Sequence, residues 1–446
     1  MPNSLILHDM ATYETDERIY ALSTAYYPSA LAIIRVSGDG CVESLSRIFS
    51  GKKKLLESGS NTLLHGYLND TSGKKIDEVV LSVYRKGHGY TSEEAVEITM
   101  HGSLPLIQKL SLTLEEIGFR KALPGEFTYR AFMHGRMDLT EAEAVEEIVS
   151  AKSERAARSA LSRLSGSLSS VILSMKEKLV DILSSLEVQL DYAEDEILED
   201  WVYPEEDVMG IISSIDRLLS TYDSARMYSQ GAMVVLAGAT NAGKSSFFNA
   251  LLKENRAIVS AKEGTTRDYI EAGCVIRGLP VRLFDTAGLR NAGEEIEAEG
   301  IERSKSLMSE ADLVIYISDG SDENLPLEDE RTMIVYSKLD EGRKGHPLEF
   351  SSVTGEGIGE ILDEVERHLL GSSASESDVS IESQRQKEGL SECREILLES
   401  LKARDSSVDI MALSFQSAIR SLSSLIGEVS SDEILDNLFS KFCLGK

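Results

Sequence analysis

The chain has 446 residues and a formal net charge of −29, and 42% of its residues are hydrophobic. This length exceeds what one ordinary core supports, so we expect two or three domains. The composition is that of a globular protein, which excludes fibrous and extensively disordered classes. No uncharged apolar run of about 18 to 20 residues occurs, and no basic segment precedes an apolar run at the amino terminus. We therefore expect a cytoplasmic protein without membrane spans, a location that also fits the scattered, unpaired cysteines Cys41, Cys274, Cys393 and Cys443.

Residues 1–125 mix short apolar runs with turn residues. The runs ALAIIRV and EVVLSVY have the composition of strands, and residues 104 to 117 have the spacing of one amphipathic helix. This mixture predicts an α+β domain.

Helical periodicity dominates residues 126–229. Thr140 and Glu143 have the spacing of a capping box, which predicts a helix start at Thr140, and a further helix is expected at about 205 to 228. One buried helical face is indicated by apolar residues that recur every three or four positions: Met175, Leu179, Ile182, Leu186 and Leu190.

Residues 230–370 alternate between strand, loop and helix patterns, the order of a parallel sheet with crossover helices. The serine-rich segment GSSASESD then reads as a linker, and helices resume over residues 371–446. Their apolar stripe comprises Phe415, Ile419, Leu422, Ile426 and Val429. We predict a multidomain α/β protein: an amino-terminal α+β domain, then a helical domain that a P-loop α/β domain interrupts.

The inserted domain begins with a phosphate-loop pattern. The strand in MVVLAGA, residues 233 to 239, ends at Gly238, and GATNAGKS, residues 238 to 245, leads into a helix. Such a loop turns backbone amides and the helix dipole toward phosphates. Lys244 would neutralise the β- and γ-phosphates, and the Ser245 hydroxyl would bind Mg²⁺. The loop residues assigned to the nucleotide are Asn241, Ala242, Gly243, Lys244, Ser245 and Ser246.

Two polar segments follow in the order of a GTPase. Thr265 and Thr266 match a switch loop, in which Thr266 would be a second Mg²⁺ ligand. VRLFDTAG ends a strand at Asp285, whose carboxylate would hold a water of Mg²⁺, and the amide of Gly288 would sense the γ-phosphate. Thr286 and Ala287 lie between these two residues and belong to the same nucleotide-contacting segment.

Leu289 stands where many signalling GTPases have the glutamine that orients the attacking water. Leucine cannot do this, so hydrolysis depends on another polar group or ion. The candidates are Asn241, Arg267, Glu294, Glu295 and Glu297, and for Glu297 the alternative is an ordinary solvated helix face.

MIVYSKLD places Ser337, Lys338 and Asp340 where GTPases usually carry Asn-Lys-x-Asp. Asp340 would accept hydrogen bonds from guanine, and the Lys338 stem would pack on the base. Serine is shorter than asparagine, so we predict guanine binding that is weaker by on the order of 1 kcal/mol, the worth of one neutral hydrogen bond. Backbone groups of Ser351, Ser352 and Val353 would complete the base site.

The large negative charge would repel nucleic acid at long range, so an RNA partner needs a local basic patch. Lys152, Arg155 and Arg163 fall on one face of a helix at about 100° per residue and form the candidate patch. The alternative is again a solvated helix face.

Together with this topology, five segments resemble the MnmE (TrmE) family, GTPases that modify the wobble uridine of certain tRNAs. The resemblance spans essentially the whole chain. It rests on LPGEFTYRAFMHGRMDLTEAEAV at 123 to 145, GATNAGKSSFFNALL at 238 to 252, GTTRD at 264 to 268, DTAGLR at 285 to 290 and LFSKFCLGK at 438 to 446.

The resemblance implies a homodimer whose paired GTPase domains require K⁺. It assigns the potassium site to Asn241, Ser260, Lys262 and Thr265, and it makes Glu297 the residue that orients the attacking water. Ser260 and Thr265 also count among the nucleotide-binding residues.

The resemblance also implies a site for 5-formyltetrahydrofolate or a related tetrahydrofolate. Its residues would be Arg35, Glu97, Arg136 and Lys446, although AYYPSA replaces the glycine-rich stretch that is usual before IIRVSG. Cys443 would act in one-carbon chemistry or substrate positioning. The alternative is an incidental cysteine near a frayed terminus.

The implied reaction uses GTP hydrolysis and a folate-derived one-carbon unit to install a (carboxymethyl)aminomethyl-type group at C5 of the tRNA wobble uridine. An FAD-dependent MnmG-type partner would share it, and no G-x-G-x-x-G flavin fingerprint occurs in this chain. One alternative is a regulatory GTPase in ribosome assembly without folate chemistry. Another, motivated by Ser337, is a helical scaffold with an inactive nucleotide site.

Overall fold

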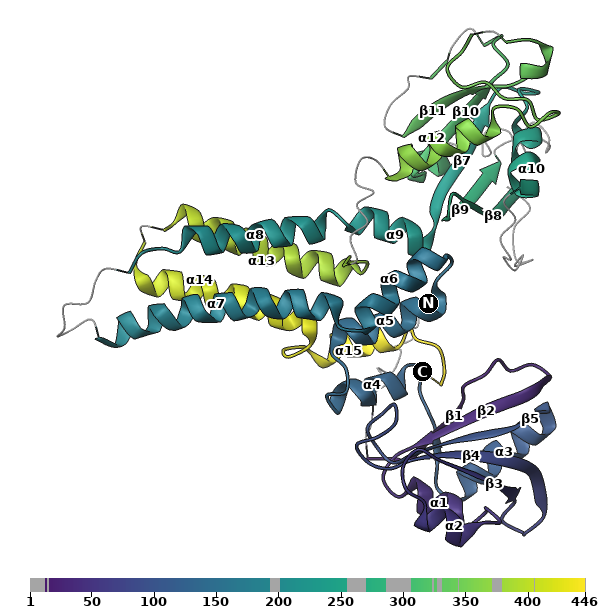
Figure 1. Cartoon of the computed structure of the whole chain (residues 1–446), viewed down its shortest axis with the longest axis vertical. Helices are drawn as coiled ribbons and strands as arrows, with labels where there is room; N and C mark the ends of the chain where they lie inside the picture. Colours follow the sequence, from purple (N-terminus) through teal and green to yellow (C-terminus); the bar gives the residue numbers. More distant parts are fainter. Residues whose placement is uncertain are drawn as a thin grey trace, which may run out of the picture. The chain divides into compact units, whose positions relative to one another are not determined.

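A computed structural model describes residue 13 and residues 16–192, 201–254, 270–285, 306–322, 325–326, 331–343, 345–370, 379–404 and 406–445. The chain divides into two compact units, Met1–Glu146 with Leu422–Lys446, and Glu147–Ser421 (Figure 1). The finer division predicted at residues 125, 229 and 370 stays a prediction.

The first unit contains a six-stranded sheet in the order β3-β4-β5-β2-β1-β6, antiparallel except for the pair of β1 and β6. Buried side chains such as Ile34, Leu81 and Ile98 pack with Leu110 and Leu114 of a helix. This confirms the predicted α+β domain. The strands are β1 Ile19–Leu22, β2 Ser29–Ser37, β3 Thr62–Asn69, β4 Lys75–Tyr84, β5 Ala95–Gly102 and β6 Arg120–Lys121, and the helices are α1 Cys41–Ser46, α2 Lys52–Glu57 and α3 Leu104–Glu116.

The carboxyl-terminal segment packs against the helix that follows the sheet. Helix α15 (Asp432–Phe439) contacts α4 (Glu126–Met133), and the ring of Phe439 meets that of Tyr129 edge-on at 5.4 Å. Gly125 precedes α4 with φ 69°, and a Cβ at this position would lie 2.4 Å from the Phe439 carbonyl oxygen. Glycine is therefore required for this close approach.

Helix α5 (Leu139–Ser150) begins earlier than predicted. Asp138 Oδ1 accepts hydrogen bonds from the amides of Thr140 at 2.8 Å and Glu141 at 3.0 Å, and Glu141 Oε2 accepts from the Asp138 amide at 2.9 Å. The cap predicted at Thr140 lies two residues too late, because the upstream carboxylate of Asp138 accepts from the first helical amides.

The helices of the second unit are α6 Glu154–Leu164, α7 Ser167–Tyr192, α8 Glu205–Leu219, α9 Tyr222–Gln230, α13 Gln384–Lys402 and most of α14 Val408–Ile426. Met175, Leu179, Ile182 and Leu186 are buried along α7, as predicted. The helix expected at 205 to 228 is instead two helices. Val429 lies beyond the end of α14 and is 53% exposed, so the predicted apolar stripe ends at Ile426.

The inserted domain contains a five-stranded sheet in the order β11-β10-β7-β9-β8. All neighbours are parallel except the β8–β9 hairpin. This arrangement confirms the predicted α/β domain. Its strands are β7 Ala232–Gly238, β8 Ile270–Ile276, β9 Leu279–Asp285, β10 Leu313–Ser318 and β11 Thr332–Tyr336, and its longer helices are α10 Lys244–Glu254 and α12 Ile358–Leu370.

Candidate functional site

The phosphate loop joins β7 to α10 through a backbone that L-residues rarely adopt. Gly238 has φ 135° and Gly243 has φ 98°, and a Cβ at Gly238 would lie 2.1 Å from the Ile317 carbonyl oxygen. Asn241 is also left-handed, with φ 64°. Lys244 Nζ donates to the carbonyl oxygens of Gly238 at 2.9 Å and Ala239 at 2.6 Å. The ammonium is therefore held at the loop that sequence assigned to the phosphates.

Ser245 lies in the first turn of α10, and Asp285 ends β9. Ser245 Oγ donates a hydrogen bond to Asp285 Oδ2 at 3.1 Å, and Asp285 is 2% exposed. Hydroxyl and carboxylate oxygens are the hard donors that Mg²⁺ prefers. The two residues therefore fit the metal role predicted for them.

The segment predicted to bind the base lies directly against the phosphate loop. A Cβ at Gly243 would lie 3.3 Å from Cβ of Ser337, which is 6% exposed. Asp340 Oδ1 accepts a hydrogen bond from Ser351 Oγ at 2.6 Å, and that hydroxyl accepts from the Val353 amide at 3.2 Å. The fold thus brings together segments that are about a hundred residues apart in sequence.

The Ser337 hydroxyl is buried without a hydrogen-bond partner among the described residues. Its backbone amide, by contrast, donates to the Ser318 carbonyl at 2.8 Å. The backbone is therefore in register with the neighbouring strand, and the departure from the usual motif is confined to the side chain.

Of the remaining loop residues, Ala242 is buried, and Ser246 and Ser352 are exposed. Several predicted residues lie outside the described part of the chain: Ser260, Lys262, Thr265, Thr266, Thr286, Ala287, Gly288, Glu297 and Lys446. Their roles stay predictions, as do those of Arg267, Leu289, Glu294 and Glu295.

A second candidate site is a pocket of about 290 Å³ in the first unit. Arg35 on β2 and Glu97 on β5 are directly opposite in the strand register, and Arg136 lines the same pocket. Glu97 Oε1 accepts hydrogen bonds from Arg35 Nε at 3.0 Å and Nη2 at 2.8 Å. The structure therefore places three of the four predicted folate residues around one cavity.

Aromatic residues that the sequence analysis missed complete this pocket. The Arg35 guanidinium lies 5.3 Å from the ring centre of Tyr90 and 5.6 Å from that of Phe127. Burial raises the pKa of the Tyr90 hydroxyl, which shares a 2.9 Å hydrogen bond with Thr128. Phe127 lies in LPGEFTYRAF, part of a segment that resembles the MnmE (TrmE) family, and this resemblance could have marked it as a pocket residue. Tyr84 and Thr91 also line the pocket, and no periodicity marks them.

The chain terminus reaches this pocket within the first unit. The Gly445 carbonyl accepts hydrogen bonds from Arg35 Nη1 at 3.3 Å and from Ser23 Oγ at 3.4 Å. Cys443 is exposed, and its carbonyl accepts from the Gly125 amide at 3.5 Å. The terminal segment therefore lies beside the predicted folate residues.

The predicted basic face of Lys152, Arg155 and Arg163 was wrong. Lys152 precedes α6 and donates to the Gln230 carbonyl at 2.9 Å. Arg163 is fully buried, where it pairs with Glu147 at 2.5 Å and Glu382 at 2.7 Å. The alternative interpretation, a solvated helix face, is also wrong for Arg163, because this side chain is buried. Helical spacing does not apply to Lys152, which lies between α5 and α6, and it does not reveal the partners that cover Arg163.

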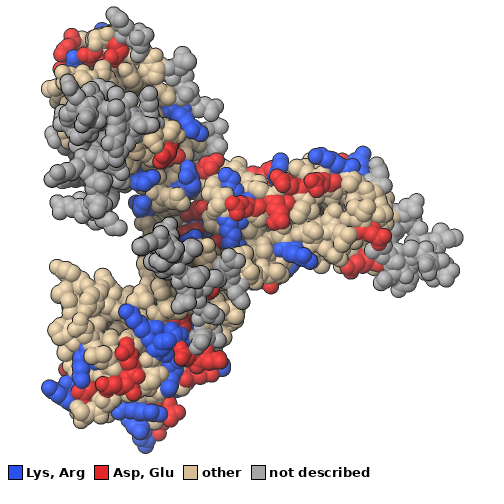
Figure 2. Space-filling view, turned by 180° about the vertical axis from the view of Figure 1, so that it is seen from behind, with Lys and Arg blue, Asp and Glu red and all other residues tan. Residues whose placement is uncertain are grey.

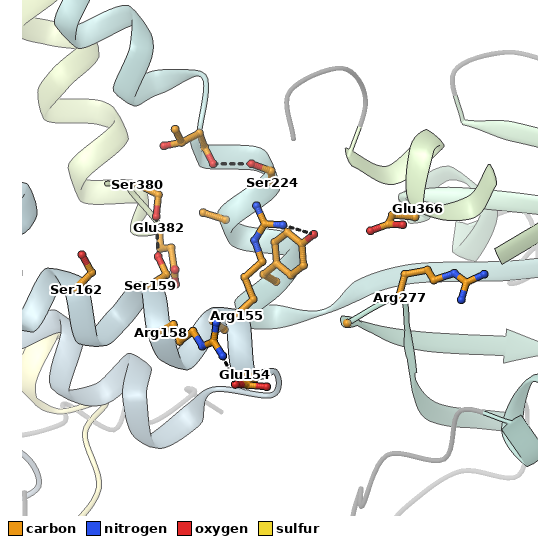
Figure 3. Close-up of a pocket in the computed structure, with 15 residues that line it drawn as sticks. Glu154, Arg155, Arg158, Ser159, Ser162, Ser224, Arg277, Glu366, Ser380 and Glu382 are labelled. Carbon is orange, nitrogen blue, oxygen red and sulfur yellow. Dashed lines mark hydrogen bonds and ion pairs between the residues drawn. The ribbon is translucent and has the colours of Figure 1, made fainter. Parts of the chain in front are cut away.

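Arg155 is also engaged within the second unit. Its guanidinium lies 4.3 Å from the Tyr228 ring centre and donates to the Tyr228 hydroxyl at 3.0 Å. These residues line a cavity of about 510 Å³, in which Arg155 and Arg158 of α6 lie across from Arg277 and Glu366 of the inserted domain (Figure 3).

The guanidinium groups of this cavity have partners of their own. Arg158 pairs with Glu154 at 2.5 Å, and Arg277 Nε donates to Asp363 at 2.6 Å. The cavity therefore has little excess positive charge. On the face shown in Figure 2, acidic and basic side chains are interspersed in small groups, and the described residues there form no continuous basic surface.

Comparisons with known proteins agree with this architecture. The model of the MnmE helical domain matches residues 139–443, and the model of the GTP-binding protein TrmE N-terminus matches residues 18–136. A tRNA modification GTPase MnmE of Borrelia recurrentis is 38% identical over 97% of this chain and 99% of its own length. The chain belongs to the MnmE (TrmE) family.

Other relatives match the chain equally completely. The tRNA modification GTPase MnmE of Treponema denticola is 37% identical, with 97% of this chain and 99% of the relative covered. That of Aquifex aeolicus is 36% identical, with 96% and 100% covered. Membership of this family and the geometry at Lys244, Ser245 and Asp285 identify the chain as a GTPase. In the described part of the chain, no helix has the length and apolar character to cross a membrane.

Proposed function

We propose that this GTPase of tRNA modification hydrolyses GTP between the phosphate loop and the Ser337–Asp340 segment. Lys244 binds the β- and γ-phosphates, and Asp340 accepts hydrogen bonds from guanine. The observation that supports this proposal is the approach of Ser337 to Gly243, which joins the two halves of a nucleotide site.

Ser245 and Thr266 would hold Mg²⁺, with Asp285 supporting one of its waters. Asn241, Ser260, Lys262 and Thr265 would hold K⁺. When bound, these cations offset the negative charge that develops on the phosphates during hydrolysis. The carboxylate of Glu297 would orient the attacking water, because leucine at position 289 has no polar atom for that task. The left-handed backbone at Asn241 supports this reading, since it turns the loop at the residue assigned to K⁺.

The pocket of the first unit would bind the pterin end of 5-formyltetrahydrofolate. A guanidinium, a carboxylate and two aromatic rings suit a planar heterocycle with several donors and acceptors. Its volume of about 290 Å³ suits a ring system better than a whole folate. The remainder of the cofactor would therefore extend out of the pocket.

The chain and a flavoprotein of the MnmG type would together install a (carboxymethyl)aminomethyl-type group at C5 of the tRNA wobble uridine. The folate-derived one-carbon unit would supply one carbon of that group. The chain would act as a cytoplasmic homodimer. Binding of 5-formyltetrahydrofolate to the full-length protein tests this proposal. A regulatory GTPase of ribosome assembly would hydrolyse GTP and bind no folate, so absence of binding would favour that alternative.

Cys443 would act in the one-carbon step or position its substrate. This role is supported by its exposure and by the contact of Gly445 with Arg35 two residues later. The Cys443→Ser variant should keep GTP hydrolysis and lose tRNA modification in a reconstituted reaction. Full modification by this variant would remove the proposed role.

A further inference from the structure

Lys338 has an unusual backbone conformation. Its φ of 66° and ψ of 35° place it in the left-handed region immediately before the 3₁₀ helix η2 (Leu339–Glu341). A non-glycine residue rarely occupies this region, and such strain persists where surrounding contacts hold it. The backbone is held on both sides of Lys338, because the Ser337 amide donates to the Ser318 carbonyl at 2.8 Å and the Leu339 amide donates to the Phe350 carbonyl at 3.0 Å. The Lys338 ammonium forms an ion pair.

The partner is Asp319, the first residue after β10. Lys338 Nζ lies 2.8 Å from Asp319 Oδ2. The other carboxylate oxygen, Oδ1, accepts hydrogen bonds from the Ser321 amide at 3.1 Å and the Ser321 hydroxyl at 2.5 Å. The Asp319 carboxylate is thus held by its own loop through one oxygen and contacts the lysine through the other.

Asp319 is ionised at any physiological pH. The hydrogen bond from Lys338 and those from Ser321 lower the pKa of the Asp319 carboxyl well below its usual range. The side chains of Lys338 and Asp319 are 39% and 24% exposed, so the pair is accessible rather than part of the core. It stabilises the fold by little.

The ion pair does, however, restrict the lysine. A free lysine side chain samples many rotamers, and ordering it on binding costs free energy. With the ammonium anchored at the end of β10, the four-carbon stem is held in the segment that also contains Ser337 and Asp340. We propose that Asp319 is a positioning residue for the nucleotide, which holds the Lys338 stem against the face of the guanine. This inference rests on the nucleotide site proposed above.

The proposed role of Asp319 is linked to the short side chain of Ser337. The buried Ser337 hydroxyl has no partner among the described residues, and it is shorter than the amide that usually stands there. Base binding in this chain therefore depends more on Asp340 and on an ordered Lys338. Asp319 supplies that order without touching the nucleotide.

The test is a double-mutant cycle on the full-length protein with fluorescent GDP and GTP analogues. Asp319→Asn keeps the shape of the side chain and frees the ammonium, and Lys338→Met keeps an apolar stem without the charge. Each should raise the Kd for GDP and for GTP by the same factor, about three- to fivefold for a partly exposed pair. The double variant should be no weaker than either single one.

Asp363→Asn is the matched control, because it breaks the exposed pair with Arg277 in the same domain but away from the nucleotide segments. It should leave both Kd values unchanged. Asp319→Glu should restore part of the affinity that Asp319→Asn loses, which a general loss of loop structure would not allow.

Two results would overturn the inference in distinguishable ways. If Lys338→Met lowers affinity and Asp319→Asn does not, or if the two effects are additive, Asp319 does not position the lysine. If Lys338→Met itself leaves both affinities unchanged, the proposed base site is wrong, and the role of Asp319 is removed with it.

Discussion

Ser245 donates a hydrogen bond to Asp285 across 3.1 Å, from the first turn of α10 to the end of β9. The two residues are 40 positions apart, and their oxygens converge where the phosphates of a bound nucleotide would lie. This convergence supports a shared role in holding Mg²⁺.

Ser245→Ala should lower magnesium-dependent GTP hydrolysis by at least about tenfold, because it removes one ligand oxygen. The measurement is kcat/KM as a function of Mg²⁺ concentration. Asn249→Ala, an exposed change on the same helix, is the control and should behave as the wild type. An unchanged Mg²⁺ dependence in Ser245→Ala would contradict the assignment.

Ser337→Asn should raise GTP affinity by about fivefold, the equivalent of one neutral hydrogen bond. Gly243 leaves room for the longer side chain because it has none of its own. Calorimetric titration with a non-hydrolysable GTP analogue would measure the change. Ser337→Ala should bind nearly as well as the wild type, since the serine hydroxyl is too short to reach the base. Equal affinity of Ser337→Asn and the wild type would show that position 337 does not limit guanine binding.

Arg35→Lys should lower the affinity for 5-formyltetrahydrofolate by about tenfold. Lysine keeps the charge but cannot make two hydrogen bonds to Glu97 Oε1 while its head group faces Tyr90 and Phe127. Equilibrium binding to the full-length protein measures this. Glu78→Gln, which removes an exposed carboxylate paired with His65 at 2.7 Å, should not alter binding. Wild-type affinity in Arg35→Lys would place the folate elsewhere.

Arg163→Met should destabilise the helices of the second unit by about 3 kcal/mol, because it leaves the carboxylates of Glu147 and Glu382 without their buried cation. Unfolding in urea, followed by circular dichroism, measures the effect. Arg158→Met on the same helix breaks only an exposed pair with Glu154 and should change stability by less than about 0.5 kcal/mol. Similar stability of the two variants would mean that the buried pairs contribute little.

The sequence predicted the parts of this structure that depend on local pattern. The strand, glycine loop and helix around Lys244 were predictable because few backbone conformations satisfy those glycines. The meeting of Arg35 with Glu97 followed only from family resemblance, since pairing of β2 with β5 is a long-range choice.

The burial of Arg163 could not be predicted, because its partners are distant in the sequence. Arg163 resembled a surface residue because its partners, Glu147 and Glu382, lie 16 positions before and 219 positions after it in the numbering. The cap at Asp138 was missed for a local reason. Two residue pairs have the spacing of a capping box, Asp138 with Glu141 and Thr140 with Glu143, and the structure uses the first. Asp319 was missed because nothing in its own segment signals a pairing with Lys338.

We propose that the phosphate loop belongs to a potassium-dependent GTPase. Of the four proposed potassium ligands, Asn241 is the one that lies within the described residues. Asn241→Gly accepts the φ of 64° without strain and removes only the amide, so it should abolish any potassium response of hydrolysis.

The most direct measurement is the steady-state GTP hydrolysis rate of the wild-type protein in potassium and in sodium at equal ionic strength. We predict a rate at least about tenfold higher in potassium, the size of effect expected from a charge placed on the developing phosphate charge. Addition of the flavoprotein partner should preserve that ratio. Equal rates in the two salts would contradict the account.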